Sequence, residues 1–237
     1  MTLVLAESSI ERIPPELTGH PSVVAHARRK QKEPCSIILD RSYHHSAMIQ
    51  LECSKTSKTM SKRGRPDITF HFLLAGLGSP LNREGLLTVL VHTIDDHVIE
   101  IDASTRIPKN YDRFIGLLEQ LYDQRSVPPG DHPLMRIRRS TISGLLEELK
   151  PSMTIVFSTL GKPSTLEDTS PLIASTDNPL VLIGGFAHSH FEESTIKLAD
   201  YVFSIDRDAL DAWIVAGRVI YEYERSIRLP ERRLRSP

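Results

Sequence analysis

A short run of this 237-residue sequence reads Leu180-Val181-Leu182-Ile183-Gly184-Gly185, four apolar residues followed directly by two glycines. Two similar runs flank it, Thr154-Ile155-Val156-Phe157 before it and Tyr201-Val202-Phe203-Ser204-Ile205 after it. A strand with one exposed face alternates apolar and polar residues, whereas a strand buried on both faces of a parallel sheet is continuously apolar. The three runs therefore predict parallel strands covered by helices on both faces.

Helical spacing surrounds these runs. Apolar residues between 142 and 149 recur at intervals of three and four and stop before Pro151, as in an amphipathic helix. The same spacing returns between 210 and 221, with Asp208 as the expected N-cap. This alternation of helices and strands predicts an α/β fold class. The length fits one large domain or two small ones, and we interpret 1–237 as a single domain.

The first half of the chain adds several expected elements. They are strands at 2–6 and 36–39, a helix at 42–55, an exposed basic loop at 54–66, a short helix capped by Asp67, a β-hairpin with strands at 86–93 and 98–101, and a helix at 111–122. We interpret the hairpin as a small insertion at about 84–102, and residues from about 225 to 237 as a basic C-terminal extension.

Composition excludes several classes of protein. Lys and Arg number 29 against 30 Asp and Glu, a formal net charge of -1, so a polyanion can be bound only by a local concentration of positive charge. The two cysteines, Cys35 and Cys53, form no CxxC motif, which excludes a disulfide framework and a zinc finger. No apolar run is long enough to cross a bilayer, and residues 1–7 do not resemble a signal peptide. We expect a cytoplasmic protein with no membrane or metal partner.

Ligands of open parallel sheets bind beyond the carboxyl ends of the strands. Three segments follow such ends here: 158–163, 184–189 and 206–210. None matches GxGxxG or GxxxxGK[ST], so the common phosphate-binding fingerprints are missing. Gly184 and Gly185 either let a ligand approach the backbone closely or only form a tight turn, and the sequence leaves both interpretations open.

The other reactive side chains match no known catalytic signature. No GxSxG or HExxH motif occurs, and neither cysteine lies in a nucleophile signature, so nothing supports covalent hydrolase chemistry. We interpret the histidine pairs at 44–45 and 188–190 as structural or RNA-facing, because partners with zinc-site spacing are missing. Asp40, Asp67 and Asp206 are candidate acid–base or orienting carboxylates, and each could equally cap a helix.

Two basic clusters combine cations with prolines and aromatic residues. Arg63-Gly64-Arg65-Pro66-Asp67 places two guanidinium groups beside a carboxylate that can hold one of them in position. Arg106, Lys109 and Arg113 recur with interleaved aromatic residues, and would share one face if the following helix began within that stretch. Such clusters favour contact with phosphates or a splayed base; the alternative is a solvated cationic face.

Several motifs together resemble one family. They are Leu39-Asp40-Arg41-Ser42-Tyr43-His44-His45-Ser46-Ala47-Met48, Arg63-Gly64-Arg65-Pro66-Asp67-Ile68, Ser79-Pro80-Leu81-Asn82, Thr105-Arg106-Ile107-Pro108-Lys109-Asn110-Tyr111-Asp112-Arg113-Phe114 and Gly184-Gly185-Phe186-Ala187-His188. In this order they resemble the nucleolar essential protein family, also called essential for mitotic growth. The similarity runs from residue 3 to about 223.

The resemblance implies a fold and an activity. Members of the family are SPOUT-class methyltransferases, whose C-terminal part forms a trefoil knot that holds S-adenosylmethionine. They act as homodimers on small-subunit ribosomal RNA, where they methylate N1 of a pseudouridine, and they assist assembly of the small subunit, so small-subunit ribosomal proteins are further expected partners. The alternatives are a non-catalytic RNA-binding assembly factor of the same fold and, with less support, a related tRNA methyltransferase.

The resemblance also implies residue roles. The expected cofactor-binding residues are Ser158, Thr159, Leu160, Gly184, Gly185, Ser189, Ile205, Asp206, Arg207, Asp208, Ala209 and Leu210. The expected RNA-binding residues are Arg63, Arg65, Arg106, Lys109 and Arg113, and the expected catalytic residues are Arg65 and Asp67. Loss of the nucleobase proton could be helped by a base such as Asp67 or by an arginine-stabilised anion, and the sequence does not decide between them.

Two positions depart from the family pattern. Lys109 stands where the family usually has arginine, which keeps the charge but loses the planar fork that binds phosphate through two hydrogen bonds. Ser189 stands where glycine is common, so its Cβ either crowds the cofactor or is accommodated by a slightly wider turn, and the sequence leaves both alternatives open.

Overall fold

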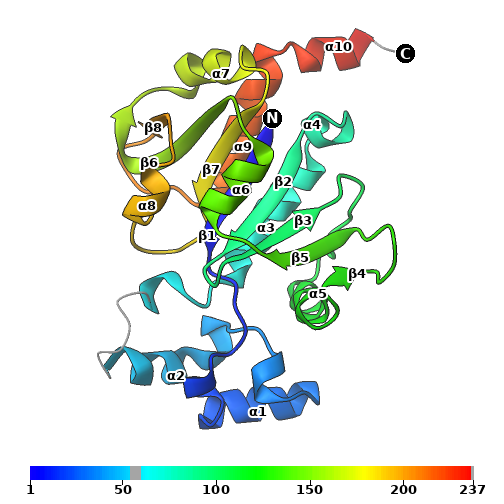
Figure 1. Ribbon diagram of the computed structural model, residues 1–237, viewed down its shortest axis with the longest axis vertical. Coiled ribbons are helices and arrows are strands. Elements are labelled where there is room, and N and C mark those ends of the chain that lie inside the picture. The colour runs from blue at the N-terminus through cyan, green and yellow to red at the C-terminus, as the bar shows by residue number, and fades with distance from the viewer. Residues whose placement is uncertain (54–59, 236–237) are drawn as a thin grey trace.

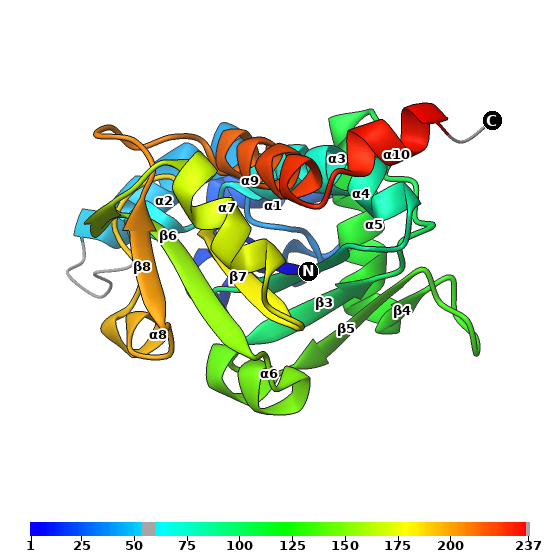
Figure 2. The same cartoon turned by 90° about the horizontal axis from the view of Figure 1, so that it is seen from above.

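One mixed sheet of eight strands forms the centre of the protein, with helices on both faces (Figures 1 and 2). The computed structural model describes residues 1–53 and 60–235, of which 51–53 and 60 are described by their backbone alone. The strands are β1 (Thr2–Ser8), β2 (Thr88–Thr93), β3 (His97–Ile101), β4 (Ser126–Val127), β5 (Met135–Arg139), β6 (Met153–Pro163), β7 (Pro179–Gly184) and β8 (Tyr201–Ser204).

The helices fall into two groups around this sheet. Those packed in the main body are α3 (Pro66–Gly78), α4 (Pro80–Arg83), α5 (Tyr111–Gln124), α6 (Ile142–Leu149), α7 (Leu166–Ala174), α8 (Glu193–Ile196), α9 (Ala212–Ser226) and α10 (Leu229–Arg235). Helices α1 (Pro21–Lys30) and α2 (Arg41–Cys53) form a separate layer at one end of the molecule (Figure 1). Short 3-10 turns lie at Pro15–Leu17, Pro34–Ser36 and Met60–Lys62.

The strand order is β4-β5-β3-β2-β1-β7-β6-β8. Pairing is parallel from β2 through β8 and antiparallel from β2 to β4. Parallel pairing is therefore confirmed for the three predicted strands β6, β7 and β8, and the predicted hairpin is confirmed by the antiparallel pairing of β2 and β3, whereas β4 and β5 were not predicted. The hairpin that we interpreted as an insertion supplies β2 and β3, and β2 pairs directly with β1 in the middle of the sheet.

Both faces of the central strands are buried, as the continuous apolar runs predicted. Leu3 and Leu5 of β1 pack into a core shared with α3, α5, α7 and α9, whereas Val4 and Ala6 point the other way, towards α6 and α8. Successive side chains of a strand point to opposite faces, so a strand covered on both sides is mostly apolar. All seven residues of β1 are buried, and its polar residues, Thr2, Glu7 and Ser8, lie at its two ends.

The expected strand at 36–39 is wrong. This segment is extended, but it makes only one isolated bridge, between Arg12 and Ile38. Ile37 and Leu39 pack into a small cluster with α1 and α2, whereas Ile38 faces the main core. The apolar run thus joins two hydrophobic clusters, and a run of this kind does not need a strand partner to be buried.

Helix boundaries also differ from the expected ones. Helix α3 begins at Pro66, so Arg65 occupies the N-cap position and Asp67 lies in the first turn instead of capping the helix. Helix α9 begins at Ala212 after Asp211, because Asp208 belongs to a turn further upstream. Proline is favoured at the first position of a helix, where its missing N–H costs nothing.

The basic segment predicted as an exposed loop at 54–66 is only partly described, because residues 54–59 lie outside the described range. The prediction is wrong for the part that is described: the Lys62 side chain is 5% exposed and contacts Glu7. A lysine can be buried when a carboxylate compensates its charge. At the other end of the chain, the expected C-terminal extension includes a helix, α10, whose Leu229 is buried.

Strand β6 is longer than expected and includes residues 158–163, which we had predicted to be a loop. A bulge between Phe157 and Lys162 lets this extension follow β8. Gly161 makes the close approach possible, because a Cβ there would lie 2.5 Å from the carbonyl carbon of Phe203. No larger residue fits at this crossing without moving the backbone.

Replacing Gly161 by alanine tests this close approach. Gly161→Ala should lower the free energy of unfolding by about 2–3 kcal/mol, because the clash is with backbone atoms. The matched control is Gly217→Ala in α9, where no atom lies within 4 Å of the added Cβ. That change should raise stability by about 1 kcal/mol through helix propensity. Urea unfolding of both variants measures the difference, and equal effects would contradict the crossing geometry.

His44 is a structural histidine of the N-terminal layer. Its side chain is fully buried, and its Nδ1 accepts a hydrogen bond of 3.0 Å from the backbone N–H of Asp40. Its Nε2 is then left to donate to Nδ1 of His26, 2.9 Å away. Burial and the nearby His26 lower the pKa of His44 to about 4, so the ring is neutral in the folded protein.

This histidine makes stability depend on pH. As pH falls below 6.5, the unfolded chain binds a proton at His44, whereas the folded chain does not until about pH 4. Between pH 7.5 and 5 this difference should cost about 2 kcal/mol of unfolding free energy. His44→Gln should remove that part of the acid destabilisation, while His45→Gln at the exposed neighbour should follow the wild-type curve. Parallel curves for all three proteins would show that His44 titrates normally.

Candidate functional site

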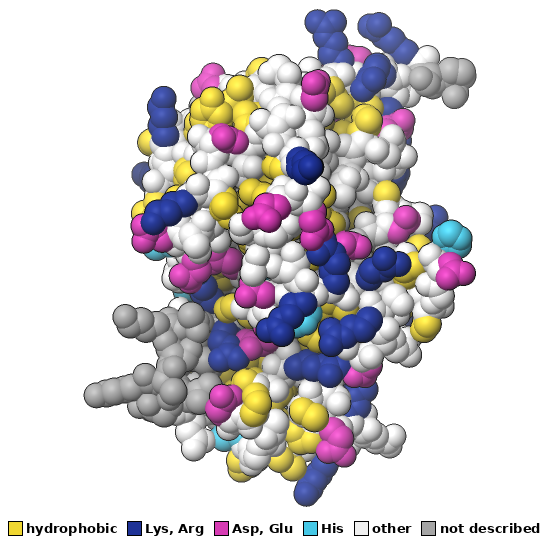
Figure 3. Space-filling model, in the orientation of Figure 1, with side chains coloured by type: hydrophobic (Ala, Val, Ile, Leu, Met, Phe, Trp, Pro, Cys, Tyr) yellow, Lys and Arg dark blue, Asp and Glu magenta, His cyan; other side chains and the backbone are white. Residues whose placement is uncertain are grey.

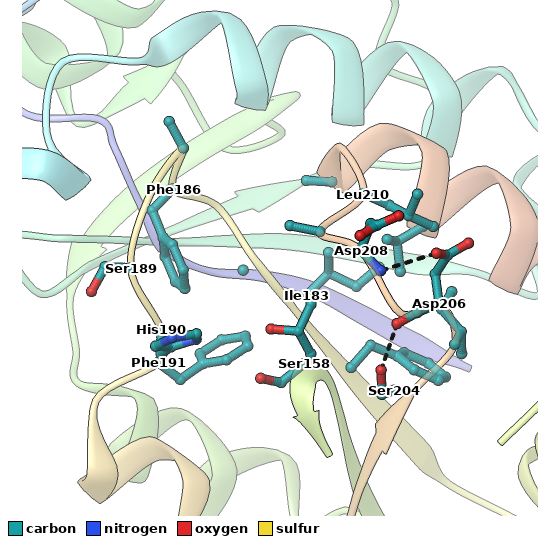
Figure 4. Close-up of a pocket in the computed structure, with 18 residues that line it drawn as sticks. Ser158, Ile183, Phe186, Ser189, His190, Phe191, Ser204, Asp206, Asp208 and Leu210 are labelled. Carbon is teal, nitrogen blue, oxygen red and sulfur yellow. Dashed lines mark hydrogen bonds between the residues drawn. The ribbon is translucent and has the colours of Figure 1, made fainter. Parts of the chain in front are cut away.

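A pocket lies beside the middle of β6 and the carboxyl ends of β7 and β8 (Figure 4). Because these strands are parallel, residues 157–159 of β6 and the segments after β7 and β8 meet at one edge of the sheet. The lining residues are Phe157, Ser158, Thr159, Ile183, Gly184, Phe186, Ala187, Ser189, His190, Phe191, Ser204, Ile205, Asp206, Asp208, Ala209, Leu210, Ala212 and Val215. The three segments predicted from the sequence are thus brought together.

The two sides of the pocket differ chemically. On one side lie Phe186, His190 and Phe191, and the two phenylalanine rings meet edge to face at 5.3 Å. Asp206, Asp208 and Leu210 lie on the opposite side, with Ile183 between the two sides (Figure 4). An apolar pocket with a few carboxylates at one side suits a flat, mostly apolar ligand that carries hydroxyl or positively charged groups.

Asp206 organises the turn on the acidic side. Its Oδ1 accepts a hydrogen bond of 3.1 Å from the backbone N–H of Asp208, and its carbonyl oxygen accepts one of 2.8 Å from the hydroxyl of Ser204 (Figure 4). An aspartate that binds the backbone two residues ahead closes a compact turn. The sequence left Asp206 open as a helix cap, and the structure assigns it to this turn.

Most of the expected cofactor-binding residues line the pocket, and three do not. Leu160 is 69% exposed, the Arg207 side chain is 91% exposed, and Gly185 packs against β1. Pocket residues that the expected set did not contain include Phe157, Ile183, Phe191, Ser204 and Val215. Several of these are strand-end residues directly beside the predicted turns, so extending each turn by one residue towards its strand would have found them.

The two glycines have different roles. A Cβ on Gly185 would lie 2.6 Å from Cα of Ser8, so this glycine allows β1 and the turn after β7 to touch. The carbonyl oxygen of Gly185 accepts a hydrogen bond of 2.9 Å from the N–H of Ser9, which fixes the contact. Gly184 lines the pocket, and a Cβ there would lie 2.9 Å from the ring of Phe186. Gly185 is therefore explained by the close approach of β1, and its backbone does not adopt the positive φ of a glycine turn.

Arg65 and Asp67 form a bidentate ion pair at the start of α3. Nε and a terminal nitrogen of Arg65 each donate to one oxygen of Asp67, both at 2.8 Å. This hydrogen bonding raises the pKa of Arg65, with Asp211 and Tyr111 adding smaller effects in the same direction. The arginine side chain remains 34% exposed, so part of it can still contact a ligand.

Arg63 is held differently from Arg65. Its guanidinium makes a double contact with Glu11, whose side chain is only 8% exposed, and the Nε–Oε1 distance is 2.5 Å. Burial of both partners indicates a structural role. Arg63 anchors the segment that carries Arg65, and we do not retain it among the RNA-contacting residues.

The other basic cluster is exposed. Arg106 and Lys109 lie in the loop before α5, since the helix begins at Tyr111 with Asn110 as its N-cap, and Arg113 lies in the first turn. The expected common helix face is therefore wrong. Arg106, Lys109 and Arg83 instead line a groove whose apolar side chains are Leu73, Leu74 and Leu77 of α3. The groove combines cations with an apolar lining.

Charge elsewhere is mixed. Figure 3 shows Lys and Arg side chains interspersed with Asp and Glu over one face, in agreement with a net charge of -1.

Among the residues that the structure describes, no group of three or more His, Cys, Asp or Glu could hold a metal ion. Within 1–53 and 60–235, no helix is both long and apolar enough to cross a membrane.

Comparison with known proteins identifies the family. The model of the EMG1/NEP1 methyltransferase family matches residues 3–224. This chain belongs to that family. Relatives named ribosomal RNA small subunit methyltransferase Nep1 are 40% identical over 94% of this chain and 95% of the relative in Pyrococcus furiosus, and 41% identical over 93% of both in Staphylothermus marinus.

A solved structure of an EMG1/NEP1 family protein agrees in fold. The crystal structure of Archaeoglobus fulgidus Nep1 bound to S-adenosylhomocysteine is 34% identical to this chain and has a TM-score of 0.82. The similarity covers 96% of this chain and 98% of that one. The resemblance drawn from the arginine and glycine motifs is thus confirmed at the level of the family.

Ser189, one of the two departures from the family pattern, is strained. Its φ of +94° lies in a region that favours glycine, and the residue lines the pocket. Ser189→Gly should therefore raise the free energy of unfolding by about 1 kcal/mol. The matched control, Ser143→Gly within α6, should lower it by about 0.5–1 kcal/mol. Thermal unfolding of both variants checks this, and destabilisation by Ser189→Gly would show that the serine hydroxyl outweighs the strain.

Proposed function

We propose that this protein transfers a methyl group from S-adenosylmethionine to N1 of a pseudouridine in small-subunit ribosomal RNA and takes part in small-subunit assembly. Its membership of a methyltransferase family fixes the type of reaction. The observation that carries the proposal is the convergence of β6 and of the segments after β7 and β8 on one pocket. Arg65, held by a carboxylate, is influenced by the charge of Asp211, which lies between the pocket residues Leu210 and Ala212.

The pocket suits S-adenosylmethionine by its lining, which combines apolar and aromatic side chains with a few polar groups. The Phe186 and Phe191 rings offer an apolar surface for the adenine, and the carboxylates of Asp206 and Asp208 can bind hydroxyl or amino groups. The A. fulgidus relative was solved with the demethylated form of this cofactor.

The chemistry requires little from the protein beyond alignment. The cofactor carries its own leaving group, so the carbon–sulfur bond breaks as the nitrogen–carbon bond forms and the N1 proton is released. No covalent nucleophile is needed, in agreement with the absence of a nucleophile signature in the sequence. Holding the two reacting groups together can supply a large part of the barrier reduction.

Arg65 is the residue that we assign to the nucleobase. Its exposed edge can stabilise negative charge on the base as the N1 proton leaves, and its pKa, raised by Asp67, keeps it cationic. Both Asp67 oxygens are already bound to Arg65. We therefore favour Asp67 as the group that orients Arg65, and an arginine-stabilised anion over a carboxylate base.

The remaining RNA contacts are assigned to Arg106, Lys109 and Arg113. Arg106 and Lys109 lie in the groove along α3, where cations can bind phosphates and the leucine side chains can face an unstacked base. Single-stranded RNA is recognised by such combinations of charge and apolar surface. A local groove of this kind reconciles a nearly neutral chain with a polyanionic substrate.

Further parts of the proposal follow from the family. We propose that the C-terminal part, which supplies the pocket, forms the trefoil knot of SPOUT proteins, and that 1–237 acts as a single domain. We also propose a homodimer, supported by exposed apolar side chains of Leu160, Tyr201 and Ile214. Small-subunit ribosomal proteins are the proposed partners during assembly, and the cytoplasm is the proposed compartment.

A methylation assay tests the proposed reaction. The wild-type protein should transfer label from S-adenosylmethionine to a small-subunit hairpin containing pseudouridine, and not to the same hairpin with uridine. Arg65→Ala should reduce transfer about a hundredfold, because the developing anion loses its donor, and should leave cofactor affinity unchanged, because Arg65 does not line the pocket. The control is Arg225→Ala, which removes an exposed guanidinium of α9 that pairs only with Glu222 among the described contacts, outside the pocket, and should leave both quantities unchanged.

Other outcomes separate the alternatives. A folded protein that binds RNA and assists assembly without transferring label would be a non-catalytic assembly factor. Transfer to tRNA in place of the hairpin would indicate a different substrate within the same reaction. If Arg65→Ala lost methyl transfer and cofactor affinity to the same extent, Arg65 would not be separate from the cofactor pocket, contrary to the proposal.

A further inference from the structure

Lys62 is a buried lysine placed between the two parts of the site. Its side chain is 5% exposed, although the sequence around it is basic and polar. It lies three residues before Arg65 in the chain. A lysine this deeply buried needs an opposite charge nearby, so its partners define what the residue holds together.

Those partners come from distant segments. Nζ of Lys62 donates to Glu7 at the end of β1, at 2.8 Å, and to Glu192 after the pocket turn, at 2.9 Å. Glu7 also accepts a hydrogen bond of 2.9 Å from the backbone N–H of Glu192. The carbonyl oxygen of Lys62 accepts a hydrogen bond from the hydroxyl of Ser9. One ammonium group thus joins the sheet, the pocket turn and the basic segment.

Lys62 also contacts the pocket wall directly. Its Nζ lies 4.8 Å from the ring centroid of Phe186, whose ring lines the pocket and packs against Phe191. A cation this close to an aromatic ring is attracted by the ring face. A ligand that restricts the motion of Phe186 and the following turn therefore also restricts the groups that contact Lys62. This effect is indirect, because no residue from 61 to 67 lines the pocket.

We propose that Lys62 is a positioning residue that couples occupancy of the pocket to the placement of the segment carrying Arg65. Occupancy orders the turn at 186–192, and Lys62 transmits that order to residues 61–67 through Phe186 and Glu192. Coupling between two sites is reciprocal, so correct placement of Arg65 in turn favours the bound turn. The functional consequence, that RNA is bound best by the cofactor-loaded enzyme, rests on the RNA-binding role proposed above for Arg65.

Hydrogen exchange measured by mass spectrometry tests the coupling without RNA. The probe is S-adenosylhomocysteine, added at saturation to the full chain. In the wild-type protein, backbone amides in both 184–192 and 61–67 should exchange more slowly, by about fivefold in 61–67, the lower end of usual coupling. In Lys62→Met, slowing should persist in 184–192 and be lost in 61–67.

The matched control is Lys30→Met. Lys30 forms an ion pair with Glu119, whose side chain is 1% exposed, so this change also leaves a buried carboxylate short of a partner. Lys30 does not line the pocket, so the ligand-dependent slowing of amide exchange in 61–67 should remain as in the wild type. Unchanged slowing in Lys62→Met, no slowing in the wild type, or equal losses in both lysine variants would overturn the proposal.

Two further variants keep the test decisive if Lys62→Met does not fold. The double change Glu7→Gln with Lys62→Met removes both buried charges together and should fold with the coupling lost. Glu192→Gln removes the link on the pocket side, where the side chain is 60% exposed, and should reduce the slowing in 61–67. Wild-type slowing in both variants would contradict the assignment of the link to these contacts.

The coupling through Lys62 and the RNA-binding role of Arg65 can be tested separately. Arg65→Ala keeps every contact of Lys62 described above, so ligand-dependent slowing around residues 61–64 should persist in this variant. If Arg65→Ala binds the hairpin like the wild type while that slowing persists, the RNA assignment is wrong and the coupling stands. If it binds RNA weakly but the wild type shows no slowing in 61–67, the coupling is wrong and the RNA assignment stands.

Discussion

Parallel pairing of β1, β7, β6 and β8 is the constraint on which the rest of the structure depends. Thr2 of β1 pairs with Leu180 of β7, and Thr154 of β6 pairs with the same residue from the other side. Parallel strands in register end at the same edge of a sheet, so the segments after them meet without any long-range polar contact to bring them together. The position of the pocket is therefore set by the parallel direction of the strands, and the side chains then determine which ligand the pocket can bind.

Close backbone approaches refine that edge. Gly185 lets β1 touch the turn after β7, and Gly161 lets the extension of β6 cross β8. At both places the two backbones are so close that no methyl group fits between them, since a Cβ at either glycine would overlap backbone atoms. The segments around the pocket can therefore take this arrangement only with glycine at these two positions. Ser189 shows the opposite case, because a side chain is retained at a φ that glycine would adopt more easily.

The basic segment is placed by charge compensation. Lys62, Arg63 and Arg65 each contact a carboxylate. The carboxylate of Lys62 is Glu7, at the end of β1, and that of Arg63 is Glu11, shortly after β1. Buried ion pairs contribute little net stability, but they define one arrangement, because any other would leave a charge unpaired. The polar network thus specifies where the exposed edge of Arg65 lies relative to the pocket.

The sequence by itself determined the α/β class, the central strands, the helices α2, α3, α5, α6 and α9, and the segments that meet at the pocket, because burial on both faces and helical spacing are local patterns. It predicted the antiparallel hairpin of β2 and β3, but it did not show that β5 and β4 extend the sheet from β3, since pairing between distant segments is not a local pattern. It also did not show that Ile37 and Leu39 pack without a strand partner or that Arg63 and Lys62 are buried. Only the tertiary structure decided those points, because the carboxylates that compensate a buried cation lie on segments far away in the chain, such as Glu7 and Glu192 for Lys62.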